Sequence, residues 1–394
     1  MSRFDEVIDR HGTGSIKWDG AKMRGVPEQA IPMWVADMDF RVADPVAEAL
    51  TNSVKHGIFG YTNTDGAYEE SVCRWFFDRF HVTMRPEWIV KTPGIVFAIN
   101  AAICAYTTPG DGVLIQEPVY YPFAQSILRN HRKVVNNELV YHNGVYSIDF
   151  ADFEEKIVSE QVKLFILCSP HNPVGRVWSR EELNRMAEIC IRHHVFIVSD
   201  EIHCDFTTEK YPHTVFSGLS EQAAGNCMGC TSPSKTFNLA GLQISNIFVP
   251  DENRRAALKK AIARTGYDEC NVMGLVACKA AYDQGAEWLD ELKEYLAGNL
   301  AYVRVFLKER LPQLHLVEPQ GTYLIWIDFS ALHMTDEALD HFIVEKAGLW
   351  LDGGRMFGKA SGQFQRFNIA CPRSVLQQAF EQLADAVAVR GKEE

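Results

Sequence analysis

Four loops of the chain carry polar or reactive side chains beside short apolar runs. They supply an amide, a carboxylate, an amine, hydroxyls and the start of an apolar helix, in residues 170–175, 200–203, 232–238 and 92–94. Taken singly, each has a plain structural explanation, because Pro-Gly loops form turns and acids at strand ends cap helices. Ligands of open α/β sheets, however, bind beyond the carboxyl ends of the strands. We therefore expect the four loops to line one crevice.

The groups expected in that crevice suit a pyridine aldehyde phosphate. The Lys235 amine would bond to the aldehyde, and the Asp200 carboxylate would keep the ring nitrogen protonated so that the ring accepts electrons. The Asn172 amide would face the ring oxygen. Hydroxyls and the free N–H groups of a helix N-terminus would hold the phosphate. The sequence thus predicts an enzyme that acts on an amino acid.

The elements that position these loops follow from the hydrophobic pattern. Short apolar runs, typical of buried strands, occur at residues 113–116, 162–169, 195–199 and 244–249. Amphipathic segments separate them, and the clearest, residues 179–194, opens with Ser179 and Glu182 at the spacing of a capping box. Strands alternating with helices indicate right-handed crossovers. We expect an α/β fold with a mostly parallel central sheet and helices on both faces.

A second, smaller α+β domain is expected at the ends of the chain. From about residue 287 the pattern changes to a long charged helix reaching about residue 311, an aromatic strand at 322–328 and a terminal helix near 375–389. With 394 residues, the chain exceeds the size at which one core stops growing. We assign residues 45–285 to a large cofactor-binding domain, and residues 1–44 and 286–394 to a small domain formed by both termini.

Composition and charge exclude several classes of partner. The formal net charge of −12 opposes binding to nucleic acid or to anionic lipid. Residues 1–20 lack the apolar core of a signal peptide, and the longest nearly apolar stretch, residues 95–106, is too short to span a bilayer. We expect a soluble, cytoplasmic protein with no nucleic acid and no membrane partner.

The ten cysteines are consistent with that compartment. Most stand singly in segments that read as core, which suits reduced thiols. Cys227 and Cys230 form a C-x-x-C, but a zinc or redox site would want a second pair or a thioredoxin-like context. We predict no metal there, and instead a strand whose alternation places the two thiols on different faces.

The order and spacing of Asn172, Asp200, Lys235 and Arg366 resemble the pattern of fold-type I pyridoxal 5'-phosphate (PLP) enzymes of the class I/II aminotransferase superfamily. The resemblance covers nearly the full length. It implies the PLP-dependent transferase fold of type I, with Lys235 as the Schiff-base lysine, Asp200 at the pyridine nitrogen and Asn172 at the ring oxygen. Arg366 is implied to grip the substrate α-carboxylate, a bidentate task that suits a guanidinium.

The same resemblance assigns the remaining contacts of the cofactor. The backbone N–H groups of Ile95 and Val96, at a helix N-terminus, would bind the phosphate, and the Ser232 hydroxyl would assist. Either Tyr120 or Tyr121 would stack on the ring, and we favour Tyr120, although both could be plain core residues.

Tyr61 resembles the tyrosine that reaches the phosphate of the neighbouring subunit's cofactor. This role counts Tyr61 among the catalytic residues and implies a homodimer with shared active sites.

Two features indicate the cystathionine β-lyase (C-S lyase) branch of MalY/PatB type. Residues 32–40, PMWVADMDF, resemble its N-terminal signature, which would place Trp34 and Val35 over the substrate, although a packing strand is the alternative. His203 stands where many aminotransferases carry a tyrosine near the ring oxygen, and Gln243 replaces a common phosphate-binding arginine, which leaves the phosphate grip open. We expect α,β-elimination from cystathionine- or cysteine-type amino acids; the alternative is an aminotransferase proper.

Other classes of function fit the sequence poorly. A dinucleotide-dependent dehydrogenase would need a glycine-rich fingerprint after an early strand, and residues 353–355, GGR, lie too late. A transcriptional effector domain would carry a basic DNA-binding module, whereas residues 1–44 are short and not basic.

Overall fold

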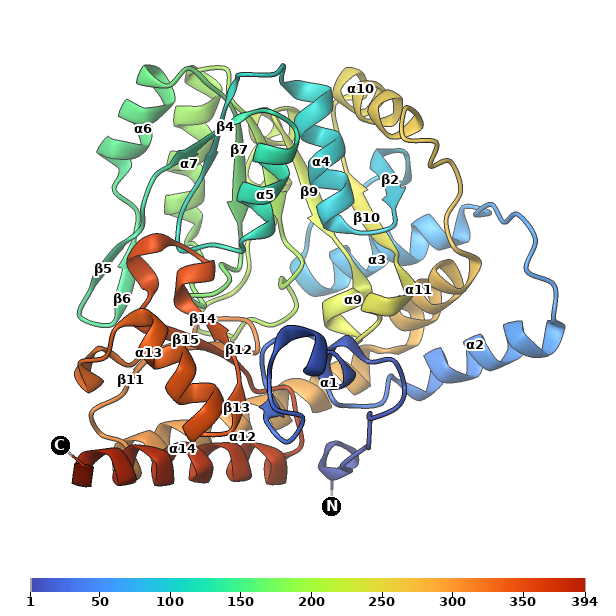
Figure 1. Cartoon of the computed structure of the whole chain (residues 1–394). Helices are drawn as coiled ribbons and strands as arrows, with labels where there is room; N and C mark the ends of the chain where they lie inside the picture. The colour runs from blue at the N-terminus through green and yellow to red at the C-terminus, as the bar shows by residue number, and fades with distance from the viewer. Residues whose placement is uncertain (1, 394) are drawn as a thin grey trace.

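The computed structural model describes residues 2–393, and a large sheet forms its centre (Figure 1). Within those residues the sheet has seven strands, in the order β2-β10-β9-β8-β7-β3-β4. Their bounds are β2 Ile89–Thr92, β10 Ser245–Phe248, β9 Cys227–Thr231, β8 Phe196–Asp200, β7 Val162–Cys168, β3 Gly112–Ile115 and β4 Lys133–Asn136. Strands β9, β8, β7, β3 and β4 run parallel to one another, whereas β10 is antiparallel to both β2 and β9. The expected mostly parallel sheet is confirmed.

Helices cover both faces of this sheet, as expected. Strands β3, β8 and β9 are buried at every position, which explains their continuous apolar runs. One face packs against α4 (Ile95–Tyr106), α5 (Pro122–Arg129) and α10 (Glu252–Ala263), the other against α6 (Phe150–Ser159), α7 (Arg180–Arg192) and α8 (Glu221–Gly225). Cys227 belongs to one core cluster and Cys230 to the other. The predicted strand with thiols on different faces is confirmed.

The capping box at the start of α7 is also present. The Ser179 hydroxyl accepts a hydrogen bond from Glu182 N at 3.2 Å, and Glu182 Oε2 accepts one from Ser179 N at 2.8 Å. Each bond satisfies a backbone donor that the helix itself leaves unpaired. The apolar face of α7 then buries Leu183, Met186 and Cys190 against the sheet.

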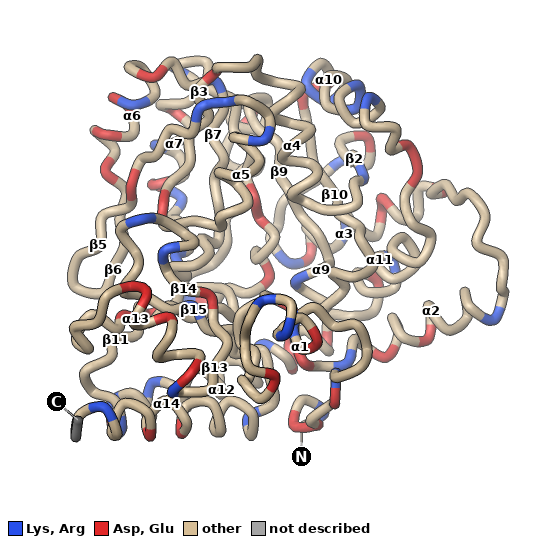
Figure 2. Tube along the Cα trace, in the orientation of Figure 1, with Lys and Arg blue, Asp and Glu red and all other residues tan. Residues whose placement is uncertain are grey.

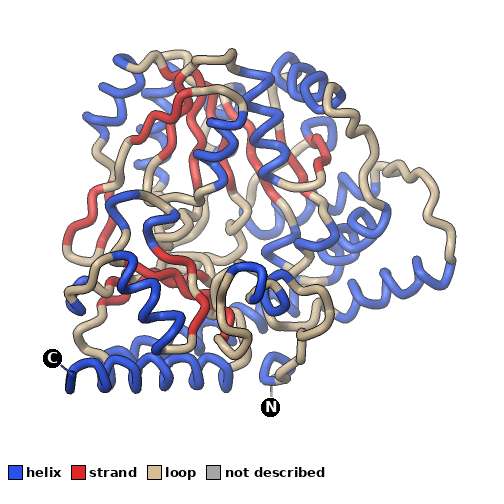
Figure 3. Tube along the Cα trace, in the orientation of Figure 1, coloured by secondary structure: helices blue, strands red, loops and turns tan. Residues whose placement is uncertain are grey.

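A smaller sheet stands apart from the large one (Figure 3). Within residues 2–393 it has four strands: β11 His315–Val317, β12 Leu324–Asp328, β15 Phe364–Asn368 and β14 Asp352–Gly353. Three helices accompany it: α12 Ala286–Arg310, α13 Asp336–His341 and α14 Arg373–Glu393. The long charged helix, the aromatic strand and the terminal helix expected from the sequence are therefore observed.

The N-terminal segment joins this smaller sheet region. Strand β1 (Ile31–Pro32) pairs in parallel with β13 (Leu349–Trp350), and Asn368 N donates to Met33 O at 2.8 Å. The buried Lys17 cation helps to hold the segment, since its Nζ pairs with Asp39 at 2.7 Å. The N-terminal segment thus contacts the smaller sheet region, and the division into domains at residues 44 and 286 remains a prediction.

A projecting arm follows the N-terminal segment in the chain and extends at the right edge of the molecule in Figure 1. Helix α2 (Asp44–His56) packs on α11 (Val272–Gln284), and residues 57–66 then extend away from the body before α3 (Ala67–Phe80) returns. The apolar side chains of Ile58 and Phe59 are exposed on this arm.

The remaining α-helices are α1 (Ile16–Asp19) and α9 (Pro233–Thr236), and the remaining strands, β5 (Val140–His142) and β6 (Val145–Ser147), form a hairpin. Basic and acidic residues are interspersed along the trace (Figure 2). Among the described residues no helix is both long enough and apolar enough to cross a membrane.

The capping box gives a stability prediction. Replacing Ser179 by alanine removes the acceptor for Glu182 N, so the free energy of unfolding should fall by about 1 kcal/mol. Urea unfolding followed by circular dichroism measures the change. Ser179→Thr, which keeps the hydroxyl, serves as the control, and equal stability of the wild type and the alanine variant would contradict the capping role.

Candidate active site

A cavity of about 200 Å³ opens at the carboxyl ends of β7, β8 and β9, beside the start of α4. The four loops selected from the sequence all contribute to its wall. Among the predicted site residues, those that line it are Trp34, Val35, Ile95, Val96, Tyr120, Tyr121, Asn172, Asp200, His203, Ser232, Lys235 and Arg366. Tyr61 lies elsewhere. The four loops therefore line one cavity at the strand ends, as expected from the sequence.

Lys235 reaches the cavity from the short helix α9. The Ser232 hydroxyl caps this helix by accepting a hydrogen bond from Ser234 N at 3.1 Å. The Lys235 ammonium donates to the carbonyl oxygen of Ala36 at 2.7 Å. Burial lowers the pKa of Lys235 to about 8, with the Arg366 cation adding to this and Asp37 and Asp200 opposing it. More of the neutral amine, the nucleophilic and basic form, is therefore present than in an ordinary lysine.

Asp200 ends the buried strand β8, and its carboxylate accepts a hydrogen bond from Ile202 N at 3.2 Å. Burial raises the pKa of Asp200 to about 7, with the neighbouring Glu201 adding to the shift and Lys235 opposing it. Such a carboxyl group gains stability when a cationic N–H donor is placed against it. A protonated pyridine nitrogen is a donor of that kind.

His203 also lines the cavity. Its Nδ1 has no hydrogen-bond partner within residues 2–393, although the side chain is buried. Burial lowers the pKa of His203 to about 3, and the nearby cations of Lys235 and Arg366 add to the effect. The imidazole is therefore neutral, and a buried ring nitrogen remains available to a polar group of a ligand.

The start of α4 also forms part of the cavity wall. The first N–H groups of a helix lack intrahelical partners, so those of Ile95 and Val96 suit a phosphate. Ser232 lines the wall, but its hydroxyl donates to the Ile244 carbonyl oxygen at 2.8 Å. To donate to a phosphate it would have to break this bond. Gln243 also lines the cavity.

Arg366, on β15, is 3% exposed and is held from several sides. Its Nη1 donates to Asn172 Oδ1 at 2.9 Å, and its Nη2 donates to the Trp34 carbonyl oxygen at 2.8 Å. Nη2 also pairs with Asp352, and the guanidinium carbon lies 4.8 Å from the centre of the Phe357 ring. A buried charge is tolerated when it is paired and hydrogen-bonded in this way. The guanidinium is thus fixed at the cavity wall.

The N-terminal segment closes one side of the cavity with backbone carbonyl groups. Besides Trp34 O and Ala36 O, the Val35 carbonyl accepts a hydrogen bond from Asn368 Nδ2 at 2.8 Å. The Trp34 indole also stacks on Trp350, with ring centres 4.6 Å apart. Trp34 therefore lines the cavity and also packs against Trp350. The two interpretations of residues 32–40, a segment over the substrate and a packing strand, are compatible.

Tyr120 and Tyr121 both line the cavity, and they pack with different cores. Tyr120 contacts the cluster that includes Phe123, whereas Tyr121 lies edge-on to Phe357 at 6.2 Å. Burial raises the pKa of both phenols. Both therefore remain neutral and present a ring to the cavity.

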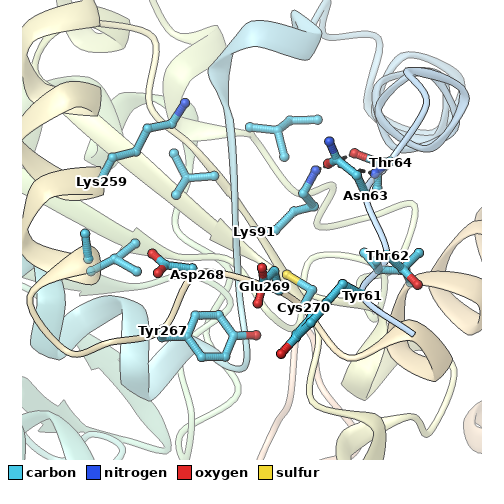
Figure 4. Close-up of a pocket in the computed structure, with 15 residues that line it drawn as sticks. Tyr61, Thr62, Asn63, Thr64, Lys91, Lys259, Tyr267, Asp268, Glu269 and Cys270 are labelled. Atoms are coloured by element: carbon cyan, nitrogen blue, oxygen red, sulfur yellow. Dashed lines mark hydrogen bonds between the residues drawn. The ribbon is translucent and has the colours of Figure 1, made fainter. Parts of the chain in front are cut away.

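Tyr61 lies on the projecting arm and is 94% exposed. It lines a separate hollow of about 670 Å³ together with Lys91, Tyr267 and Cys270 (Figure 4). Within that hollow Lys91 Nζ donates to Thr64 Oγ1 at 2.6 Å. The role of Tyr61 at a cofactor phosphate remains a prediction, since Tyr61 does not line the cavity of its own chain that holds Lys235.

Two contributors to the site were missed by sequence reasoning. Asp352, the partner of Arg366, follows the apolar residues of β13, so an acid at the end of an apolar run was the available signal. The other is the Ala36 carbonyl group, which accepts a hydrogen bond from Lys235. It gives no signal in the sequence, because every residue has a backbone carbonyl group.

Comparisons with known proteins agree with this geometry. Residues 31–383 match the family model described as aminotransferase class I and II, and the chain belongs to that family. It is similar to cystathionine beta-lyase PatB of Bacillus subtilis, with 42% identity over 98% of this chain and 100% of the relative. It is also similar to protein MalY of Escherichia coli, with 34% identity over 99% and 100% of the two chains.

Solved structures show the same architecture. Cystalysin from Treponema denticola, described as containing a pyridoxal 5'-phosphate cofactor, superposes with a TM-score of 0.95 and 36% identity over 98% of this chain and 99% of that one. A PLP-bound putative aminotransferase from Clostridium difficile gives a TM-score of 0.95 at 39% identity, over 98% and 99% of the chains. The predicted fold type I is therefore confirmed.

The environment of Lys235 gives a titration prediction. In the ligand-free protein, acetylation of Lys235 should rise with pH around a midpoint near 8, because burial disfavours its ammonium form. Asp200→Asn removes a carboxylate that supports the cation, so the midpoint should move lower. Peptide mass spectrometry measures both, with the exposed Lys163 as an internal reference for the reagent. A midpoint at the ordinary lysine value would contradict the burial argument.

Proposed function

We propose that the chain is a PLP-dependent carbon–sulfur β-lyase that acts on cystathionine- and cysteine-type amino acids. The reaction is an α,β-elimination that yields a thiol, pyruvate and ammonia. The observation that carries the proposal is the single cavity that holds Lys235, Asp200, Asn172 and Arg366. Similarity to proteins named as cystathionine β-lyases over the full length supports the choice of reaction.

The cavity fits PLP by the chemistry of its donors. Asp200, Lys235 and the unpartnered Nδ1 of His203 would meet the ring nitrogen, the aldehyde carbon and the polar edge of the ring. The N-terminus of α4 would hold the phosphate. When bound, PLP supplies a carbonyl carbon for the substrate's amino group and a ring that withdraws electrons from the substrate α-carbon.

Arg366 and Asn172 orient the substrate. A free N–H of the guanidinium is available on Nε, which has no hydrogen-bond partner within residues 2–393. An α-carboxylate bound there is held beside Lys235, because both side chains line the same small cavity. Positioning of this kind fixes which bond of the α-carbon faces the base.

Lys235 then moves the proton. Its neutral amine accepts the α-proton, and the carbon–sulfur bond breaks with the electron pair leaving on sulfur. The Lys235 ammonium so formed lines the same cavity and returns its proton to the departing thiolate. One water molecule hydrolyses the remaining three-carbon fragment to pyruvate and ammonia, so that atoms and charges balance.

Further proposals concern the assembly. We infer a homodimer with shared sites, because Tyr61 and the apolar Ile58 and Phe59 are exposed on an arm that projects from the body. We also place the protein in the cytoplasm, a proposal supported by ten free cysteines within the described residues. We also propose a large domain of residues 45–285 and a small domain of residues 1–44 and 286–394, the boundaries expected from the sequence.

The reaction is tested by product analysis. With L-cystathionine or L-cysteine, the protein should release pyruvate faster than it passes its amino group to an added 2-oxo acid. Lys235→Ala should lose roughly 100-fold or more of this rate, since it removes the general base. Coupled pyruvate detection and absorbance of the cofactor measure the two reactions. Faster transfer to the 2-oxo acid would support the aminotransferase alternative instead.

The shared site is tested by mixing variants. Lys235→Ala protein and Tyr61→Ala protein should each be weakly active, whereas their mixture should regain activity through heterodimers that hold one intact site. Native mass spectrometry verifies subunit exchange, and a mixture of Lys235→Ala with itself is the control. Exchange without regained activity would contradict the role of Tyr61.

A further inference from the structure

The wall of the cavity carries two cations among the described residues that line it, Lys235 and Arg366. In the proposed reaction Lys235 is the base, and Arg366 binds the α-carboxylate of the half that is cleaved. Cystathionine, however, carries a second carboxylate at the far end of its sulfur substituent. Any cation that binds this distal carboxylate therefore lies beyond the lining residues.

Arg24 lies just outside the cavity, over the indole ring of Trp34, which lines it. The guanidinium carbon of Arg24 is 4.3 Å from the centre of the Trp34 ring and 6.0 Å from the centre of the Trp350 ring. Trp34 also contacts the second guanidinium, because its carbonyl oxygen accepts a hydrogen bond from Arg366 Nη2. One residue of the wall thus touches both cations, a separation that the flexible chain between the two carboxylates of cystathionine can bridge.

The turn that carries Arg24 is anchored on both sides. Residues Lys22–Arg24 form a single 3-10 turn that ends at Gly25, whose φ of +67° lies in the left-handed region that glycine adopts readily. Ala21 before the turn and Val26 after it pack in one small cluster with the two tryptophans. The backbone of Val26 also donates to the Ala21 carbonyl oxygen at 3.0 Å. The Arg24 side chain therefore extends from a fixed backbone.

The guanidinium of Arg24 is exposed and has its donors available. No other residue within the range 2–393 forms a hydrogen bond or an ion pair with it, whereas Arg10 and Lys17 of the same segment are paired with Asp37 and Asp39. Stacking on an aromatic ring uses the face of a guanidinium and leaves the N–H groups at its edge free for a carboxylate.

The charge of Arg24 also acts on the cavity wall. Burial raises the pKa of Asp352, and the cations of Arg366 and Arg24 oppose that shift. Burial likewise raises the pKa of Tyr121, with Asp352 adding to the shift and the same two cations opposing it. Both Asp352 and Tyr121 line the cavity. An anion on the side of the cavity that these residues form therefore lies within the field of Arg24.

We propose that Arg24 is a specificity-determining residue, which binds the distal carboxylate of the substrate while Arg366 binds the carboxylate of the cleaved half. The preferred substrates are then cysteine derivatives whose sulfur carries a chain that ends in a carboxylate, rather than a neutral chain of the same shape. This inference rests on the proposed lyase function, because it concerns the sulfur substituent of the same substrate.

The test compares two substrates that differ by one charge. S-(3-carboxypropyl)-L-cysteine is cystathionine without its distal amino group, and S-(3-carbamoylpropyl)-L-cysteine has an amide in place of the distal carboxylate. The holoenzyme should prefer the carboxylate in kcat/KM, and Arg24→Gln should lower this preference about fivefold, the effect of one exposed ionic contact. The ratio of the two substrates cancels effects of the variant on the shared chemistry. Arg24→Lys keeps a positive charge and should keep part of the preference.

The matched control is Arg85→Gln. Arg85 is also an exposed arginine over a tryptophan, with its guanidinium carbon 5.5 Å from the centre of the Trp88 ring, but neither residue lines the cavity. This variant makes the same change in net charge and should leave the preference unchanged. Thermal unfolding verifies that each variant is folded, and Arg24→Met, which keeps the apolar stem, replaces Arg24→Gln if the latter is not.

A binding measurement separates the role of Arg24 from the lyase function. Lys235→Ala protein loaded with PLP lacks the base, so calorimetry can give the Kd of each compound without turnover. Adding Arg24→Gln should weaken binding of the carboxylate about fivefold relative to the amide. Equal effects on both compounds, or no preference in the wild type, would overturn the proposal. If the wild type cleaves neither compound but the binding shift appears, the lyase function fails while the role of Arg24 stands.

Discussion

The buried guanidinium of Arg366 is the interaction on which the site depends. It connects three distant parts of the chain: the N-terminal segment through Trp34, the large sheet through Asn172 and the smaller sheet through Asp352. Removing a guanidinium from water is costly, and only several good partners offset that cost. The cavity therefore lies where the three partners of Arg366 come together. The contacts that stabilise the buried guanidinium also form part of the cavity wall.

Three other buried polar groups of the cavity lack the partners that Arg366 has. Asp200, Lys235 and His203 are each buried without a full set of partners. Burial raises the pKa of Asp200 and lowers the pKa of Lys235 and of His203, and each shift favours the neutral form of the side chain. Groups poised in this way respond strongly to a ligand that supplies the missing charge or hydrogen bond. Arg366 is held in place by its partners and keeps one donor, Nε, without a partner within residues 2–393, whereas these three respond through their protonation.

Much of the fold and site followed from the sequence because their signals are local. The capping box of Ser179 and Glu182 and the placement of Lys235 after a buried strand depend on neighbours in the chain. Relations between distant segments carried no such signal. The antiparallel direction of β10 is invisible in an apolar run, and Asp352 faces Arg366 only because of a strand register. The Ser232 hydroxyl is already used within its own helix cap and by Ile244.

The pairing of β1 with β13 has a consequence for synthesis of the chain. Ile31 and Pro32 leave the ribosome long before their partners Leu349 and Trp350. Contacts of such long sequence separation form late, because closing the intervening loop costs entropy. The large sheet can assemble during translation, whereas the wall formed by Trp34, Val35 and Ala36 closes afterwards. The cavity wall is thus completed only after both paired segments, β1 and β13, have been synthesised.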